Sequence, residues 1–298
     1  MRAPRTALAA DGVLLAITAF WATSFVVVKD ALASADPVTF LALRFGAAAV
    51  ACTALAWREG LHLPSIRAGV RLSPLLFGGY ALQTAGLWWT TPARSAFLTG
   101  LCVLFVPFVG WALLGRRPRP AILLGVSLAA VGMYLMTLYG KGGGGGEAWT
   151  GDVLTLGCAV SYAFHVVLTE RYAAGARPSV MVATQVWGVL LLSLPCLLVF
   201  PVRLQPNAHL WGVVLYTGVL ATAVAISLQT WAQARTTAVR AALVFALEPV
   251  FTAALGVWLG REILSSTEWA GGALIVLGVV AGELAPQGAG AEQPAGTA

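Results

Sequence analysis

Glu248 is the residue whose type and position most suggest chemistry, because it is a carboxylate inside a long apolar run and directly precedes Pro249. A proline inside a helix removes one backbone hydrogen bond and leaves the carbonyl four residues earlier without its donor. A carboxylate beside such an opened helix could bind a cation or take up a proton. The same glutamate could instead make an interhelical hydrogen bond that stabilises a kink, and both interpretations stay open here.

Other polar side chains also fall inside apolar runs, where ionisable groups are costly and usually face a bundle interior or a cavity. Arg44 could form paired bonds to the carboxylate of a substrate, or it could pair with Asp36 or cap a neighbouring helix. His165 could gate protons or bond a substrate, or it could hold two helices together. Three glutamines in separate runs favour a polar lining, although a bond between helices explains each one individually: Gln83, Gln185 and Gln229.

Two aromatic residues near the middle of corresponding runs are candidates for the wall of the same cavity. The candidate substrate-binding set is therefore Trp21, Arg44, Gln83, Tyr162, His165, Gln185, Gln229 and Glu248, with Glu248 as the candidate coupling residue. Pro107 and Pro249 are the candidate hinges, because they lie in corresponding runs and prolines kink helices. The four cysteines and three histidines have no metal-ligand spacing, so we expect no metal site, no catalytic residues and no cofactor.

The composition indicates which elements must position these residues. Hydrophobic residues make up 59% of the chain and charged residues 10%, whereas a typical soluble domain is about 25% charged. This excludes an ordinary soluble enzyme, and it excludes intrinsic disorder, which requires few apolar residues. The net charge of +6 does not indicate nucleic-acid binding, because the basic residues form no stripe and no recognition module is present. We expect a protein that crosses the lipid bilayer several times.

A spanning helix needs roughly 20 mostly apolar residues, and the sequence contains ten such runs. They are too long and continuous for barrel strands, which have about 10 alternating residues. If the N-terminus is cytoplasmic, most of the 18 basic residues fall on the cytoplasmic side, so both termini are predicted to be cytoplasmic. The predicted spans are 12–32, 38–57, 72–91, 94–114, 120–139, 152–172, 180–200, 210–231, 238–259 and 267–284.

The two halves of the chain resemble each other. Residues 94–116 match residues 239–261, and residues 11–29 match residues 152–170 more loosely, with Trp21 opposite Tyr162. Because five spans is an odd number, the second half enters the membrane in the opposite sense, as in the inverted repeats of secondary transporters. The predicted fold is an all-α integral membrane protein of ten transmembrane helices in two inverted five-helix repeats. Its parts are residues 10–140, a glycine-rich linker at 141–150, residues 151–285 and a disordered tail at 286–298.

Several short motifs occur in order along both halves: Phe20-Trp21-Ala22-Thr23-Ser24-Phe25, Leu43-Arg44-Phe45, Gly79 to Leu87, Phe105-Val106-Pro107 and Ala246-Leu247-Glu248-Pro249. Together they resemble the drug/metabolite transporter superfamily, in its EamA-type ten-helix group. The resemblance implies export or exchange of small metabolites, amino acids or drugs across the bacterial inner membrane. The expected partners are a small-molecule substrate and the lipid bilayer, without nucleic acid, and the expected state is a monomer or homodimer.

Two functions compete with a secondary transporter that works by alternating access. An intramembrane enzyme would need a nucleophile–base pair, a metal cluster or paired carboxylates at membrane depth. The sequence has one deep carboxylate and neither an HExxH nor a Gly-x-Ser-x-Gly motif, so we expect no enzyme. A non-transporting scaffold or sensor stays open as the alternative, although no soluble module is appended.

Overall fold

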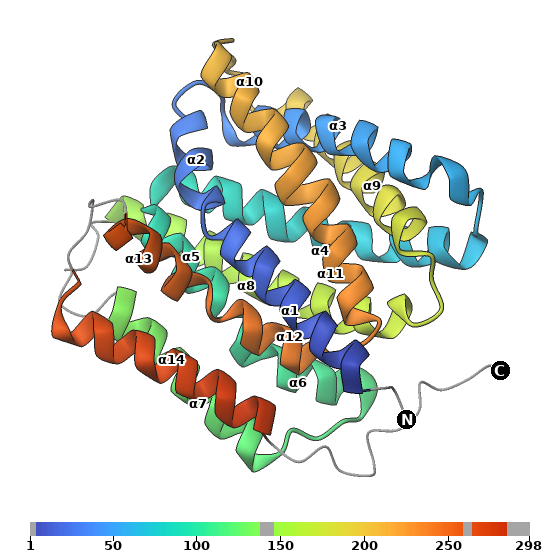
Figure 1. The fold of residues 1–298 in the computed structure, drawn as a ribbon. Helices are drawn as coiled ribbons and strands as arrows, with labels where there is room; N and C mark the ends of the chain where they lie inside the picture. The colour runs from blue at the N-terminus through green and yellow to red at the C-terminus, as the bar shows by residue number, and fades with distance from the viewer. Residues whose placement is uncertain (1–3, 138–145, 259–263, 285–298) are drawn as a thin grey trace.

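The computed structural model is built of helices (Figure 1) and describes residues 4–137, 146–258 and 264–284. Within these ranges it has no strand, and an isolated β-bridge joins Ala35 to Leu204. The elements are α1 (Pro4–Trp21), α2 (Ser24–Ala31), α3 (Pro37–Ala56), η1 (Trp57–Glu59), α4 (Leu63–Trp89), α5 (Pro92–Gly100), α6 (Cys102–Leu114), α7 (Pro120–Thr137), α8 (Gly146–Ala173), α9 (Pro178–Val199), α10 (Ala208–Leu215), η2 (Tyr216–Val224), α11 (Ala225–Gln233), α12 (Ala238–Phe245), α13 (Glu248–Trp258) and α14 (Ser266–Leu284).

Seven segments of the described chain are long and apolar enough to cross a membrane: Leu8–Ala31, Pro37–Glu59, Arg94–Leu114, Trp149–Ala173, Pro178–Val199, Ala208–Gln233 and Ala238–Leu255. Two further apolar helices are shorter, at Pro120–Met136 and Ser266–Gly282. The remaining predicted span falls in α4, which has 27 residues. The chain is therefore an all-helical membrane protein, while the count of ten spans and the two inverted repeats stay predictions.

The predicted linker at 141–150 overlaps a helix. Helix α8 begins at Gly146, so residues 146–150 belong to it. Glu147, Ala148 and Trp149 follow the glycine run and have a higher helix propensity than glycine. Residues 141–145 and the predicted tail at 286–298 lie outside the described residues.

Three of the predicted spans are interrupted near their middle. The first stops at Trp21 and resumes at Ser24 as α2, the fourth is broken at Leu101, and the ninth is broken between Phe245 and Glu248. Pro249 is the second residue of α13, where its missing N–H has no intrahelical partner to lose.

Pro107, unlike Pro249, lies inside its helix, and α6 continues through it. The break in the fourth span lies at Leu101, before Pro107, so a proline does not mark it. The hinge roles of Pro107 and Pro249 stay predictions.

The predicted eighth span contains a π-helical segment, η2, between α10 and α11. Thr222 Oγ1 donates to the carbonyl of Thr217, five residues earlier, at 2.8 Å. From the first span, Trp21 Nε1 donates to the carbonyl of Ala221 at 2.9 Å. π-helical turns are rare and occur frequently at functional sites, and this one faces the break in the first span.

Helices α7 and α14 pack backbone against backbone and lie side by side along one edge of the bundle (Figure 1). A methyl group on Gly125 would lie 2.6 Å from the carbonyl oxygen of Gly278, and one on Gly132 would lie 2.5 Å from that of Gly271. Small residues allow such an approach in membranes, where van der Waals packing rather than hydrophobic burial holds helices together.

Asp36 caps α3 and also holds the loop that precedes α10. Its Oδ1 accepts from the N–H groups of Val38 and Thr39, both at 3.0 Å, and its Oδ2 accepts from the N–H of Arg203 at 2.7 Å. Burial raises the pKa of the Asp36 carboxyl, but hydrogen bonds from Thr39, Arg203 and Val38 outweigh burial and leave the pKa below its ordinary value of 3.8. Lys29, near the end of α2, binds the end of another helix. Its Nζ donates to the carbonyl of Leu87 at 2.7 Å, at the end of α4.

We expect Gly132→Ala to destabilise the protein, because the added methyl group meets the backbone of α14. Overpacking of this kind costs about 1–3 kcal/mol. The melting temperature in detergent tests this against Gly110→Ala, since nothing lies within 4 Å of a methyl group on Gly110. The control should melt at or above the wild-type temperature, and equal melting temperatures for the two variants would contradict the tight contact.

Asp36→Asn should lower the melting temperature at neutral pH, because an amide oxygen is a weaker acceptor than a carboxylate. A carboxyl with a depressed pKa stabilises the folded state above its ordinary pKa, and this stability is lost as the pH falls through the lowered value. The difference from wild type should therefore be complete at neutral pH and shrink below pH 3.8. Asp30→Asn, on the exposed side of α2, is the control; a difference independent of pH would exclude the carboxylate charge as the cause.

Candidate functional site

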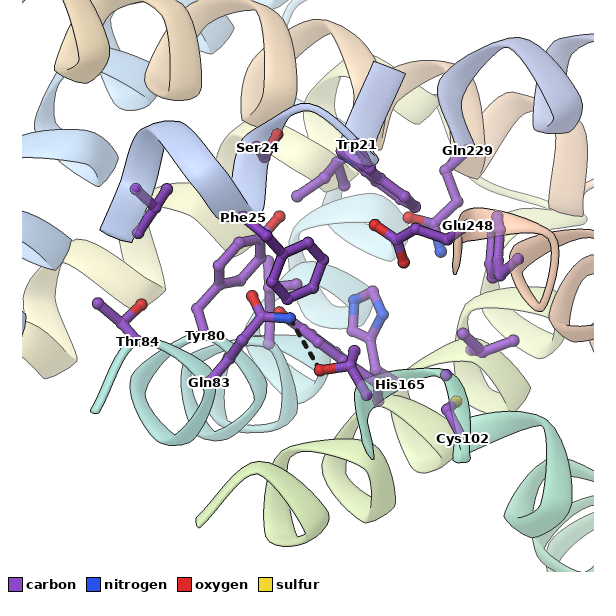
Figure 2. Close-up of a pocket in the computed structure, with 18 of the residues that line it drawn as sticks. Trp21, Ser24, Phe25, Tyr80, Gln83, Thr84, Cys102, His165, Gln229 and Glu248 are labelled. Carbon is purple, nitrogen blue, oxygen red and sulfur yellow. Dashed lines mark hydrogen bonds between the residues drawn. The ribbon is translucent and has the colours of Figure 1, made fainter. Parts of the chain in front are cut away.

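A cavity of about 110 Å³ lies where the interrupted helices meet (Figure 2). Gln185, one of the eight predicted substrate-binding residues, is fully buried behind His165 and does not line the cavity. The other seven do: Trp21, Arg44, Gln83, Tyr162, His165, Gln229 and Glu248.

Glu248 is the first residue of α13, beside the break in the ninth span. It is 7% exposed, and Figure 2 shows its carboxylate pointing into the cavity near Gln229 and His165. Within the described part of the chain, no donor or cation binds this carboxylate, so the interhelical hydrogen bond considered above is not formed there. The partial positive charge of a helix N-terminus favours a carboxylate at this position.

Gln229 belongs to a chain of amides that joins two helices. Its Nε2 donates to Oε1 of Gln233 at 2.9 Å, and Gln233 Nε2 donates to the carbonyl of Val166 in α8, also at 2.9 Å. On the opposite wall, Gln83 Nε2 donates to Oγ1 of Thr99 at 3.2 Å (Figure 2). Gln83 thus binds a neighbouring helix directly, whereas Gln229 is joined to α8 through Gln233, and both glutamines line the cavity.

Aromatic rings form the wall beside these polar groups. The ring centres of Trp21 and Phe245 are 5.5 Å apart, and those of Tyr80 and Tyr162 are 5.7 Å apart in an edge-on arrangement. The ring of Tyr162 packs directly against Gly79, because a methyl group at position 79 would overlap the tyrosine ring.

Arg44 is held by a hydrogen bond and by an aromatic face. Its Nε donates to Thr222 Oγ1 in the π-helical segment at 3.0 Å, and its guanidinium carbon lies 4.5 Å from the ring centre of Tyr80. A cation–π contact is strongest when the cation is removed from water, and Arg44 is buried. Asp36, the alternative partner considered above, is bound by Thr39 and the Arg203 backbone instead.

His165 owes its orientation to Gln185. The distance from His165 Nε2 to Gln185 Oε1 is 2.8 Å. An amide oxygen can only accept, so this bond requires the proton on Nε2, and in the neutral imidazole it leaves Nδ1 as an acceptor. Gln185 therefore supports the site from behind the cavity wall.

Several lining residues were missed from the sequence: Ser24, Phe25, Thr84, Thr99 and Cys102. The hydroxyl groups could have been found by the same rule as the glutamines, since polar groups in apolar runs face the interior. Phe25 and Cys102 give no such signal. Among the described residues, no group of three or more His, Cys, Asp or Glu side chains could hold a metal ion.

A family model described as "EamA-like transporter family" matches residues 9–138 and 149–281. The chain belongs to the EamA-like transporter family. The resemblance of the sequence motifs to EamA-type drug/metabolite transporters is thereby confirmed.

Relatives of this EamA-family chain carry transporter names. An "uncharacterized transporter" of Archaeoglobus fulgidus is 30% identical and covers 92% of this chain and 85% of its own length. The "uncharacterized transporter YwfM" of Bacillus subtilis is 26% identical, covering 90% and 91%. The "uncharacterized inner membrane transporter YedA" of Escherichia coli is 25% identical, covering 90% and 89%. A solved crystal structure matches the fold with a TM-score of 0.76 at 21% identity, covering 94% of this chain and 96% of that chain.

The His165–Gln185 bond predicts energetic coupling between the two side chains. Gln185→Leu leaves the buried Nε2–H of His165 without an acceptor, which costs about 1–3 kcal/mol. We expect the melting temperature in detergent to fall in Gln185→Leu and in His165→Phe. The double variant should lose less than the sum of the two, because no unpaired group then remains. Strictly additive losses would contradict the bond.

Proposed function

We propose that this EamA-family protein is a secondary transporter that moves a small organic molecule across the membrane by alternating access. The observation that carries the proposal is the cavity of about 110 Å³ among interrupted helices. The carboxylate of Glu248 points into it and has no partner among the described residues. Family membership and the transporter names of its relatives support a transporter rather than an enzyme.

The lining suits a cargo that has both polar and apolar parts. Glu248 and Arg44 offer opposite charges, His165 offers an acceptor, and Trp21 and Tyr162 offer aromatic faces. A few convergent polar groups in an apolar wall are typical of small-molecule sites. Membership of the EamA-like transporter family implies a cargo of small metabolites, amino acids or drugs that is exported or exchanged, and this lining is compatible with such molecules.

Glu248 is the proposed coupling residue. A buried carboxylate without a counter-ion is stabilised when it takes up a proton or a cationic group. Competition between the two at one carboxylate would couple movement of the cargo to movement of a proton. Pro249, next to it at the break in the ninth span, and Pro107 in the fourth are the proposed hinges.

The proposal includes an arrangement in the membrane: two inverted five-helix repeats, at 10–140 and 151–285, with both termini in the cytoplasm of a bacterial cell. The family model matches once in each half, and the Escherichia coli relative is named an inner membrane transporter. The protein acts as a monomer or homodimer in the inner membrane.

Thermal stabilisation of the purified protein in detergent is the first test of the cargo. A ligand that binds only the folded state raises the melting temperature by mass action. A panel of amino acids, nucleobases, sugars, polyamines and cationic drugs should contain one class that stabilises the protein. The same class should then be taken up by proteoliposomes in counterflow, and stabilisation without counterflow would contradict transport.

Glu248→Gln should slow counterflow about tenfold or more, because a hydrogen bond to a charged group contributes about 1.5–3 kcal/mol. It should also flatten the dependence of the rate on pH, since the amide cannot take up a proton. Glu59→Gln is the matched control, because Glu59 is an exposed carboxylate in η1. An unchanged rate and pH profile in Glu248→Gln would exclude the coupling role.

A further inference from the structure

Two arginine–aspartate ion pairs join helices that are far apart in the sequence. Arg94 of α5 pairs with Asp152 of α8, where its Nε also donates to the second carboxylate oxygen at 3.2 Å. Arg240 of α12 pairs with Asp11 of α1 at 2.9 Å. Each pair therefore links the first half of the chain to the second, and neither pair was expected from the sequence.

The two arginines sit in the same local setting. Each is the third residue of a short helix, and each donates its backbone N–H, at 3.3 Å, to the threonine that caps that helix, Thr91 or Thr237. α5 and α12 are also the first segments of two of the three interrupted spans, the fourth and the ninth.

The two aspartates are likewise placed alike. Asp11 precedes Trp21 by the same number of residues as Asp152 precedes Tyr162, and both aromatic residues line the cavity. In the predicted duplication Asp11 and Asp152 are equivalent, as are α5 and α12. The predicted alignment places Arg94 on Val239, one position before Arg240, so the two ion pairs match in their helices and aspartates, with the arginines one position out of register.

The pairs lie at opposite ends of α8. At its beginning, Thr90 Oγ1 donates to Asp152 at 3.2 Å, beside Arg94. Near its end, Glu170 accepts from the N–H of Ala238 at 2.8 Å, where the helix that carries Arg240 begins. At about 1.5 Å per residue, positions 152 and 170 are roughly 27 Å apart. The cavity residues of α8 lie between them.

Each pair ties together two helices that form the cavity. α1 and α12 supply Trp21 and Phe245, and α5 and α8 supply Thr99 and Tyr162. The helices of one end therefore cannot separate until the ion pair at that end breaks.

We propose that Arg94–Asp152 and Arg240–Asp11 are the two gates of the cavity, and that one breaks while the other stays formed. This rests on the proposed alternating-access function. The side chains of both pairs are 15–22% exposed, and all four residues lie at or near the ends of predicted spans, where water is available. A partly hydrated ion pair is weak enough to break in a transport cycle, because its charges are not stranded in hydrocarbon.

Cys102, a native residue of the cavity wall, reports which end is open. In a background with Cys52→Ala, Cys158→Ala and Cys196→Ala, a membrane-impermeant maleimide is added to right-side-out or inside-out vesicles. Asp152→Asn should raise the labelling rate from the outer face and Asp11→Asn from the cytoplasmic face. We expect increases of about tenfold, the shift that about 1.4 kcal/mol produces.

The controls separate the gates from a general loss of charge or fold. Asp30→Asn removes an exposed aspartate of α2 and should leave labelling unchanged. The exchanged pair Arg94→Asp/Asp152→Arg should restore protection. Where an aspartate variant does not melt cooperatively, Arg94→Gln or Arg240→Gln breaks the same pair from its other side. Labelling that rises from the same face in both variants, or in neither, overturns the proposal.

The labelling does not depend on finding the cargo. If it follows the expected faces while no compound of the panel shows counterflow, the gates stand and the transport proposal fails. If counterflow is found and the labelling does not change, the gates fail and the transport proposal stands.

Discussion

Interrupted backbone inside a membrane is the constraint on which this structure depends. A backbone N–H or carbonyl without a partner costs several kcal/mol in hydrocarbon, so a helix can break only where protein or a water-filled cavity surrounds the break. Residues on both sides of each of the three breaks line the same cavity: Trp21 and Ser24, Gly100 and Cys102, Phe245 and Glu248. The cavity and the breaks are therefore two aspects of one arrangement, since each makes the other possible.

Helix ends also explain how the interior accommodates charge. An unpaired buried charge is strongly unfavourable. Glu248 is at the N-terminus of α13, and Lys29 binds carbonyls at the C-terminus of α4, so each charge meets a helix end of the opposite partial charge. Arg44 has no helix end and depends on Thr222 and the face of Tyr80 instead. The π-helical segment matters for this reason, because it positions Thr222.

Much of the cavity lining could be predicted, because a polar side chain in a long apolar run usually faces the protein interior or a cavity rather than lipid. That argument found Glu248, His165 and Gln229. It could not tell the cavity wall from the layer behind it, which depends on how each helix is rotated, and Gln185 lies in that second layer, against His165. It could not find Phe25, because an apolar side chain does not stand out among the apolar residues of its span.

The breaks and the ion pairs needed the assembled fold. A proline is a visible signal, yet the fourth span breaks at Leu101 rather than at Pro107. Arg94 and Asp152 are visible as charges near the ends of predicted runs, but their pairing depends on which helices meet. The family resemblance covered nearly the whole chain. It did not predict the positions of the helix breaks or the partners of the charged residues, which depend on how the helices pack together.

The backbone contact between α7 and α14 has a consequence for how such a protein can diversify. Among the described residues, none from these two helices lines the cavity. Their contact depends on the absence of side chains at Gly125, Gly132, Gly271 and Gly278, not on any residue that lines the cavity. Substitutions in the cavity wall can therefore accumulate without disturbing this seam. The lining of the cavity and the packing of α7 on α14 can therefore be changed by separate mutations, so one arrangement of helices is compatible with many different cavity linings.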